Sequence, residues 1–354
     1  MKERIEWIDH ARAFAIFCMV FGHIEVFTMG HYHGFFHRLQ GLFCMPLLFF
    51  LSGLVAKPQY SFSDSCQCIK KKFFQLIVPF FCCGSLYVFL CCPDCPWWFL
   101  FWCPKGEAHM GYWFLLVLFE VYLLFSMVKL LTLKLLHGSQ NGRGFVFVSF
   151  AVWMLLLIAL VAGHFDVYPK EPLWTAISFH RIYNNFPFFI LGYWLMRHRE
   201  KMEGVFKAKI FTAVSTLFIP LYVLRDRYEV DNLPFNWIVI SLAVYSIIYL
   251  FYRHSDVLYG SLRRGLSYVG KHTLEIYVLH YFFLPIGMTW LNDLIAPQGI
   301  ADHILILELI LCTSLALAVI CVTLMCAWII RKNELLARII LGKIKEAKTS
   351  IASK

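Results

Sequence analysis

Three ionisable side chains, Asp9, Arg12 and His23, lie in the first apolar stretch of the chain, where charged groups are costly. Eleven helical positions advance about 1100°, so Arg12 and His23 share one face to within about 20° and lie roughly 16 Å apart along the axis. Asp9 lies about 40° from His23 by the same geometry. This stripe offers anion binding by the guanidinium and proton transfer by the imidazole. We predict that His23 is a general base and that Asp9 orients Arg12; the alternative is a structural ion pair and a histidine that bonds a neighbouring helix.

The composition and the apolar runs predict an all-α integral membrane protein. The 354 residues are 60% hydrophobic and 15% charged, with a mean hydropathy of +0.66, whereas soluble domains carry about 25% charged residues. Apolar runs long enough to cross a bilayer recur along the chain, and backbone groups in lipid must satisfy their own hydrogen bonds. We expect about ten transmembrane helices, near residues 9–28, 42–57, 76–92, 112–130, 145–162, 184–197, 209–225, 236–252, 273–292 and 304–330.

The distribution of Lys and Arg predicts the orientation. With the N-terminus inside, most of the 32 basic residues fall in the inner segments, as the positive-inside rule requires. Both termini are therefore expected in the cytoplasm, and the net charge of +10 is explained without a nucleic-acid partner. Residues 1–330 form the expected membrane domain. Residues 331–354 form a basic amphipathic cytoplasmic tail, expected to lie on the lipid bilayer.

Short motifs in a fixed order resemble the acyltransferase family 3 membrane proteins over about residues 3–330. The first is an Arg, ten residues and a His, which is similar to the family's first-helix signature. Each motif is short, but their order along the chain is specific. The motifs are Arg12 with His23, residues 43–53 (FCMPLLFFLSG), 70–79 (KKKFFQLIVP), 112–115 (YWFL), 186–193 (FPFFILGY) and 270–280 (GKHTLEIYVLH).

The resemblance implies a donor, a reaction and a location. It implies transfer of an acetyl or other small acyl group from cytoplasmic acetyl-CoA, or another acyl-CoA, to a hydroxyl of a cell-surface polysaccharide or its precursor, at a bacterial cytoplasmic (inner) membrane. Because the phosphates of coenzyme A need cations, Arg12, Lys71 and Lys72 are predicted to bind the donor. His23 either takes the hydroxyl proton or forms an acyl-imidazole, and the sequence leaves both routes open. The family often has two Arg three apart where this chain has Lys72 and Gln75.

Four further side chains are predicted to line the site for a glycan or glycolipid acceptor: Trp113, Arg181, Asn185 and His280. Each has a structural alternative. The tryptophan fits interfacial anchoring, the Arg and Asn fit a helix cap, and the histidine fits an interhelical hydrogen bond. Near the last motif, Glu275 is expected to pair with Lys271 at helical i,i+4 spacing.

No metal is expected. Four cysteines crowd the second outer loop, where thiols or disulfides are favoured over zinc because only one Cys-x2-Cys spacing is present. Three histidines in the first outer loop have no nearby acidic or Cys partner, which favours a solvated loop. These residues are Cys91, Cys92, Cys95 and Cys103, and His31, His33 and His37.

Two other classes of protein compete with the enzyme. A transporter that exports a glycan precursor would also have many helices and buried charges, although the sequence shows no repeated half. A structural membrane subunit would leave the stripe of Asp9, Arg12 and His23 without a role. The acceptor, the acyl group and the oligomeric state, a homodimer included, stay open.

Overall fold

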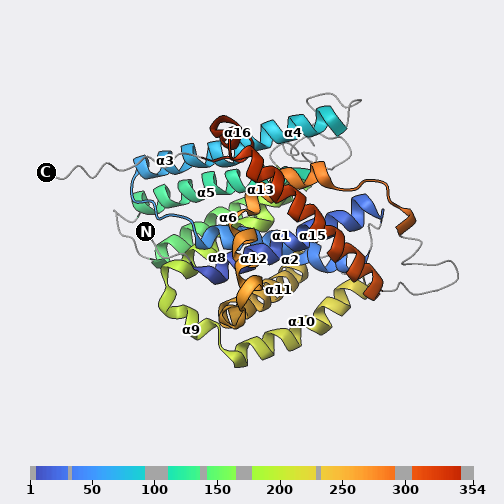
Figure 1. The fold of residues 1–354 in the computed structure, drawn as a ribbon. Helices are drawn as coiled ribbons and strands as arrows, with labels where there is room; N and C mark the ends of the chain where they lie inside the picture. Colours follow the sequence, from blue (N-terminus) through green and yellow to red (C-terminus); the bar gives the residue numbers. More distant parts are fainter. Residues whose placement is uncertain are drawn as a thin grey trace. The chain divides into compact units, whose positions relative to one another are not determined.

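The computed structural model describes residues 5–30, 34–91, 111–135, 142–164, 178–228, 233–291 and 305–343, which are helices joined by turns, with no strand within these ranges (Figure 1). Eight of the described helices are long and apolar enough to cross a membrane. The predicted all-α membrane fold is thereby confirmed. The eight run over Glu6–Thr28, Phe35–Leu54, Phe62–Leu90, Trp113–Leu135, Gly142–Leu160, Ala208–Tyr228, Phe235–Val257 and Leu305–Ile330.

The chain forms two compact units, each described by itself. The first comprises Met1–Ala56, Ser149–Leu157 and His180–Met325. The second comprises Lys57–Val148, Ile158–Phe179 and Cys326–Lys354.

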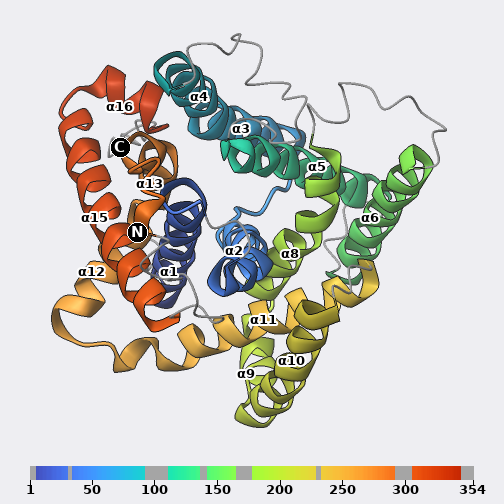
Figure 2. The same cartoon turned by 90° about the vertical axis from the view of Figure 1, so that its right-hand side faces the viewer.

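In the first unit, α1 is the central helix and contacts α2, α11, α12 and α13, while α10 packs along α11 (Figure 2). His10 of α1 is fully buried, and its ring nitrogens bond the hydroxyls of Ser255 and Ser267 at 2.5 and 2.9 Å. The helices are α1 (Glu6–His23) with its π-helical end η1 (Ile24–Thr28), α2 (Phe35–Leu54), α8 (Phe179–Arg197), α9 (Met202–Val205), α10 (Ala208–Tyr228), α11 (Leu233–His254), α12 (Gly260–Lys271), α13 (Thr273–Leu279) and α15 (Leu305–Ile330).

Glycines allow close helix contacts in this unit. A Cβ on Gly53 of α2 would overlap the carbonyl oxygen of Phe189, and a Cβ on Gly192 of α8 would overlap that of Phe50. A Cβ on Gly270 of α12 would likewise overlap the backbone of Asp9 in α1. Small residues let membrane helices approach this closely, so α12 lies directly against the start of the predicted stripe.

The predicted helix over 273–292 is wrong, because the segment breaks in its middle. α13 ends at Leu279 and a single 3-10 turn, η7 (His280–Phe283), follows. The Nδ1 of His280 donates to the carbonyl oxygens of Ile276 at 3.0 Å and Tyr277 at 2.8 Å. These bonds satisfy carbonyls that a continuing helix would use, and Pro285 cannot donate to a further turn.

Other boundaries also differ from the predicted ones. The second span begins at Phe35 rather than near 42. The sixth, α8, is a regular helix but is not among the eight long apolar candidates. The basic run lies inside a helix that continues into the third span, and Ser61 caps its start by accepting from the Asp64 amide.

The second unit contains α3 (Phe62–Lys72), the π turn η2 (Phe73–Ile77) and α4 (Val78–Cys91), which form one helical run. α5 (Trp113–Leu135) packs along α3 and η2. The ends of α6 (Gly142–His164) also belong to this unit.

The tail begins with α16 (Glu334–Ile340), which contacts α4 within the second unit. Asn333 caps it by accepting from the amides of Leu335 and Leu336. Residues 344–354 lie outside the described ranges, so the division at residue 331 stays a prediction.

Candidate functional site

His23 and His280 are in direct contact. His23 is the last residue of α1 and His280 opens η7, so the break after α13 places the second ring beside the first. The Nδ1 of His23 lies 2.8 Å from the Nε2 of His280. The rings are stacked at 9°, with centroids 5.1 Å apart. On the other side of His23, the hydroxyl of Tyr281 lies 3.3 Å from its Nε2.

The hydrogen bonds determine which ring nitrogens carry protons. Because carbonyl oxygens only accept, Nδ1 of His280 must donate to Ile276 and Tyr277. In a neutral ring its Nε2 then accepts, so Nδ1 of His23 donates to it. The remaining lone pair of the cluster lies on Nε2 of His23, next to the Tyr281 hydroxyl. A base positioned in this way can remove a proton from an incoming hydroxyl.

Two predicted acceptor-binding residues of α8 lie in the same unit. The guanidinium of Arg181 is within electrostatic range of the Tyr277 and Tyr281 hydroxyls, which places a cation near the histidine pair. Asn185 is buried, and its Nδ2 donates to the Arg181 carbonyl at 2.8 Å. Its Oδ1 is buried with no partner among the described residues, so it can accept a hydrogen bond from a bound molecule.

Asp9 and Arg12, the stripe residues nearer the start of α1, both contact neighbouring helices. Asp9 is 3% exposed and lies at the Gly270 contact. Arg12 is partly buried and its Nη2 donates to the carbonyl of Leu51 in α2 at 3.4 Å. The proposed orientation of Arg12 by Asp9 stays a prediction.

Three predicted residues, Lys71, Lys72 and Trp113, belong to the second unit. The Lys72 ammonium lies 4.4 Å above the ring of Tyr122, a cation–π contact. Lys71 is partly exposed in the same helix. Trp113 opens α5 and packs edge-on against Phe114. His23, His280 and Arg181 therefore belong to the first unit, whereas the two lysines and the tryptophan belong to the second.

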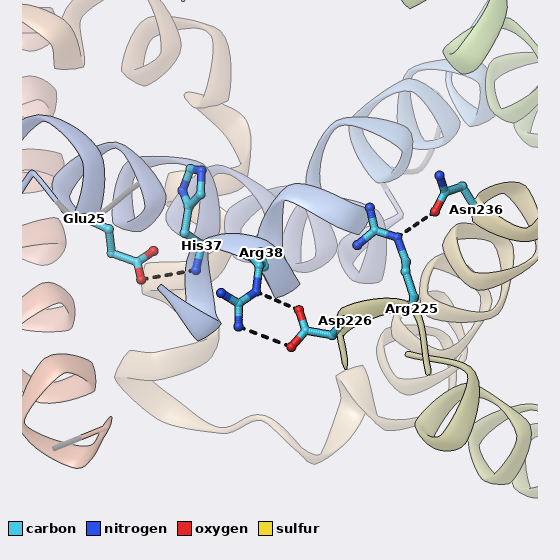
Figure 3. Close-up of polar contacts among 6 residues, drawn as sticks. All are labelled: Glu25, His37, Arg38, Arg225, Asp226 and Asn236. Carbon is cyan, nitrogen blue, oxygen red and sulfur yellow. Dashed lines mark hydrogen bonds and ion pairs between the residues drawn. The ribbon is translucent and has the colours of Figure 1, made fainter. Parts of the chain in front are cut away.

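Polar contacts connect the end of α1 with the start of α2, the start of α2 with the end of α10, and the end of α10 with the start of α11, all in the first unit (Figure 3). Arg38 holds Asp226 through two bonds, of 2.6 Å from Nε and 3.2 Å from Nη2. Arg225 donates to Asn236 at 2.6 Å. Bidentate pairs of this kind fix geometry, so these residues hold α2, α10 and α11 together near the end of α1.

Glu25 and Glu308 form a buried carboxyl pair that the sequence analysis does not anticipate. Both are 0% exposed, and the two carboxyl groups are close enough to interact electrostatically. Glu25 accepts from the His37 amide at 3.1 Å. Two buried carboxyl groups therefore lie where α15 meets the end of α1.

Tyr281 is the other site residue that sequence reasoning misses. The signal was its position directly after His280 at the end of the last motif, but its role depends on the break in the helix.

Glu275, expected to pair with Lys271, instead pairs with Nδ1 of His272 at 3.2 Å. Among the described residues, no three His, Cys, Asp or Glu side chains gather as a metal site. His31, His33, Cys92, Cys95, Cys103 and the side chain of Cys91 lie outside the described residues, so the expectations for both loops stay predictions.

Comparisons with known proteins bear on the family of the chain. Neither the curated proteins nor the solved structures gave a match. The family model described as the acyltransferase domain matches residues 5–332, which is nearly the whole chain. This multi-pass membrane protein therefore belongs to the acyltransferase 3 family.

Proposed function

We propose that the protein is an O-acyltransferase that moves an acetyl group, or a related small acyl group, from cytoplasmic acetyl-CoA to a hydroxyl of a cell-surface polysaccharide or its precursor. The single observation that carries the proposal is the lone pair on Nε2 of His23, left by the hydrogen bonds of His280. Family membership supplies the reaction class. The donor, the acceptor and the location in a bacterial cytoplasmic membrane, with both termini inside, are parts of the proposal.

In the proposed reaction, the acceptor hydroxyl takes the place of the Tyr281 hydroxyl at Nε2 of His23. The hydroxyl oxygen attacks the thioester carbonyl while its proton moves to Nε2. The tetrahedral intermediate then collapses, the C–S bond breaks, and the proton leaves Nε2 for the coenzyme A sulfur. Positioned proton transfer of this kind contributes about 10²–10⁴-fold to a rate.

His280 and Arg181 assist the two charges that develop. When His23 is protonated at Nε2, its Nδ1–H still donates to Nε2 of His280, which stabilises the imidazolium. Arg181 lies near Tyr281, where a cation stabilises negative charge on the former thioester oxygen or binds the acceptor. The free Oδ1 of Asn185 accepts a hydrogen bond from the acceptor. Trp113 is proposed to stack on a sugar ring.

The donor is proposed to approach from the N-terminal end of α1. Arg12 lies between that end and His23 on the same face of the helix, and it binds a phosphate or the carbonyl groups of the pantetheine arm. Lys71 and Lys72 are proposed as further phosphate ligands. Asp9 orients Arg12 and balances its charge.

Two alternatives make different predictions. His23 could attack the thioester itself, giving an acyl-imidazole that the acceptor then resolves. Transport of a glycan precursor is the second candidate function, and the break between α13 and η7 favours it, since broken helices line substrate sites in transporters. Only the two transfer routes consume acyl-CoA.

The first experiment compares surface glycans from cells that carry the wild-type chain, the His23→Ala chain or no copy. Mass spectrometry measures ester-linked acyl groups that mild base removes. We expect one ester to disappear in both the mutant and the deletion, with equal protein in the membrane. His23→Gln serves as a second variant, because it keeps a polar side chain of similar size but cannot take a proton at neutral pH.

Loss of the ester in the deletion but not in either His23 variant would remove His23 from the chemistry and favour transport. Purified protein with radiolabelled acetyl-CoA separates the two transfer routes. A label that stays on the wild-type chain without acceptor, and not on His23→Gln, identifies the acyl-imidazole.

A further inference from the structure

A polar cavity lies at the N-terminal end of α1, away from the histidine pair. It has a volume of about 370 Å³. One wall is the first turn of α1, with Glu6 and Asp9, and the other is α12, with Arg263, Arg264 and Lys271. The cavity lies entirely within the first unit, and the close contact at Gly270 holds the two helices together beside it.

The charges of this cavity leave two cations available. Arg263 is paired with Glu6. Lys271 is exposed, and Glu275, its expected partner, instead pairs with His272. Arg264 is exposed and, within the described part of the chain, makes only a long 3.5 Å contact to the hydroxyl of Ser261. Among the residues that the structure describes, neither Lys271 nor Arg264 has an acidic partner. Two such cations facing one cavity favour an anion.

The start of α1 adds to this preference. The helix begins at Glu6, and the preceding Ile5 offers no side-chain cap to the amides of the first turn. Such amides and the helix dipole attract negative charge. The cavity therefore combines two exposed cations with the positive end of a long helix.

The remaining lining fits a nucleotide better than a bare phosphate. Tyr268 is 43% exposed and lines the cavity, with its ring centroid 4.5 Å from that of His272, and the exposed side of the ring can stack on a base. The Asp9 carboxylate lines the opposite wall, where it can accept from ribose hydroxyls or an amino group. A lipid headgroup would use the cations but neither of these groups.

The cavity and the histidine pair lie on nearly the same face of α1. Asp9 and His23 differ by about 40° around α1 and by roughly 21 Å along it. A ligand anchored by its phosphates beside Asp9 can therefore extend a flexible arm along the stripe, past Arg12, towards Nε2 of His23.

We propose that this cavity binds the adenosine 3′,5′-bisphosphate portion of the acyl-CoA donor, with Arg264 and Lys271 as the phosphate ligands and Tyr268 stacked on the adenine. The proposal rests on the proposed function for its donor.

The test measures binding of adenosine 3′,5′-bisphosphate to the purified full-length chain in bilayer discs made of uncharged lipid, without turnover. The wild type is compared with Arg264→Gln and Lys271→Gln. We expect each variant to bind roughly tenfold to a hundredfold more weakly, the usual cost of one charged hydrogen bond. Lys209→Gln, which removes an exposed lysine of α10 outside the cavity, should bind like the wild type.

Competition separates a nucleotide site from a lipid site. Coenzyme A should displace the probe, whereas glycerol 3-phosphate, the phosphate unit of a lipid headgroup, should not. Equal displacement by both would overturn the proposal in favour of a lipid site. The proposal would also be overturned if the wild type did not bind the probe, or if both variants bound it as tightly as the wild type. His23→Ala should keep full binding, because His23 lies outside the cavity. A wild-type chain that binds the probe but transfers no acyl group would refute the proposed function and leave this site standing.

Discussion

The two ends of α1 differ in how firmly their side chains are held. At the start, the ion pair between Arg263 and Glu6 leaves the side chains 42% and 50% exposed, and Arg264 and Lys271 extend into solvent. At the other end, His280 is 0% exposed, and all four ring nitrogens of the histidine pair make contacts. One end can adapt to a ligand, whereas the other fixes the direction of a lone pair.

This difference has a physical cause. Exposed charges are screened and bind a flexible, hydrated ligand with little reorganisation. A buried, satisfied hydrogen-bond network has one low-energy arrangement, and breaking it leaves polar groups unpaired. Substitutions at the start of α1 should therefore change KM for the donor, and substitutions at its end should change kcat.

The strongest way to break this comparison is to remove His280. His280→Ala deletes the acceptor for Nδ1–H of His23, so the ring can rotate and present the wrong tautomer. We expect kcat to fall by about 10²-fold, the usual effect of misplacing a reacting group, while KM for acetyl-CoA stays within about twofold of its wild-type value. Steady-state kinetics of the purified protein measures both constants.

The matched control is His280→Gln, whose amide oxygen reaches the position of Nε2 and can accept from His23. It should recover a large part of the lost kcat. Equal loss in both variants, with unchanged melting temperatures, would mean that His280 only fills space and that the tautomer argument fails.

The stripe on α1 was predictable because helix periodicity is local. The spacing of Arg12 and His23 alone places them on one face. The contact between His23 and His280 joins residues 257 positions apart, and no local pattern specifies such a partner. The contact also needs the helix to break after Leu279, where side-chain bonds from His280 compete with the backbone ladder. A hydropathy pattern does not detect that competition, so 273–292 reads as a continuous span.

Charge pairing shows the same limit. The spacing of Lys271 and Glu275 predicts an i,i+4 pair on one helix, but α12 ends at Lys271 and α13 begins at Thr273. The two residues therefore lie on different helices, and Glu275 pairs with His272 instead. The interruption leaves Lys271 available at the cavity. The sequence thus predicted His23, His280 and Arg181 as site residues, and the fold places all three in the first unit. The cavity proposed for the donor is visible only in the structure.

A smaller effect should come from the helix contact that holds the donor cavity. In Gly270→Ala the new methyl group would overlap the backbone of Asp9, so α12 must move away from α1. Overpacking of this kind costs about 1–3 kcal/mol. We expect a lower melting temperature and a higher KM for acetyl-CoA, with kcat nearly unchanged, because the histidine pair is distant along α1.

Gly265→Ala on the same helix is the control, since its Cβ would meet open space and alanine favours a helix. It should melt at the same or a higher temperature. A fall in kcat for Gly270→Ala, with KM unchanged, would contradict the division of labour between the two ends of α1.

The smallest effect is expected at an exposed ion pair that belongs to neither end. Glu203 of α9 accepts from the Tyr252 hydroxyl at 2.7 Å and pairs with Arg253 at 2.9 Å. The hydrogen bond from Tyr252, and then the charge of Arg253, lower the pKa of Glu203. The stabilisation is therefore fully present above the unfolded value of about 4.3 and is lost as pH falls through the lower folded value.

Glu203→Gln should lower the melting temperature at pH 7 only slightly, on the order of 1 °C, because both partners are exposed and screened. The difference from the wild type should vanish as the pH is lowered past the folded pKa, and high salt should reduce it at pH 7. Thermal unfolding from pH 7 to pH 3 measures this trend, and Glu200→Gln in the preceding turn η5 (Arg199–Lys201) is the control for loss of a nearby exposed carboxylate. A large decrease at pH 7 that vanishes at low pH would show that exposed pairs hold this fold firmly, and the adaptable end of α1 would then need another explanation.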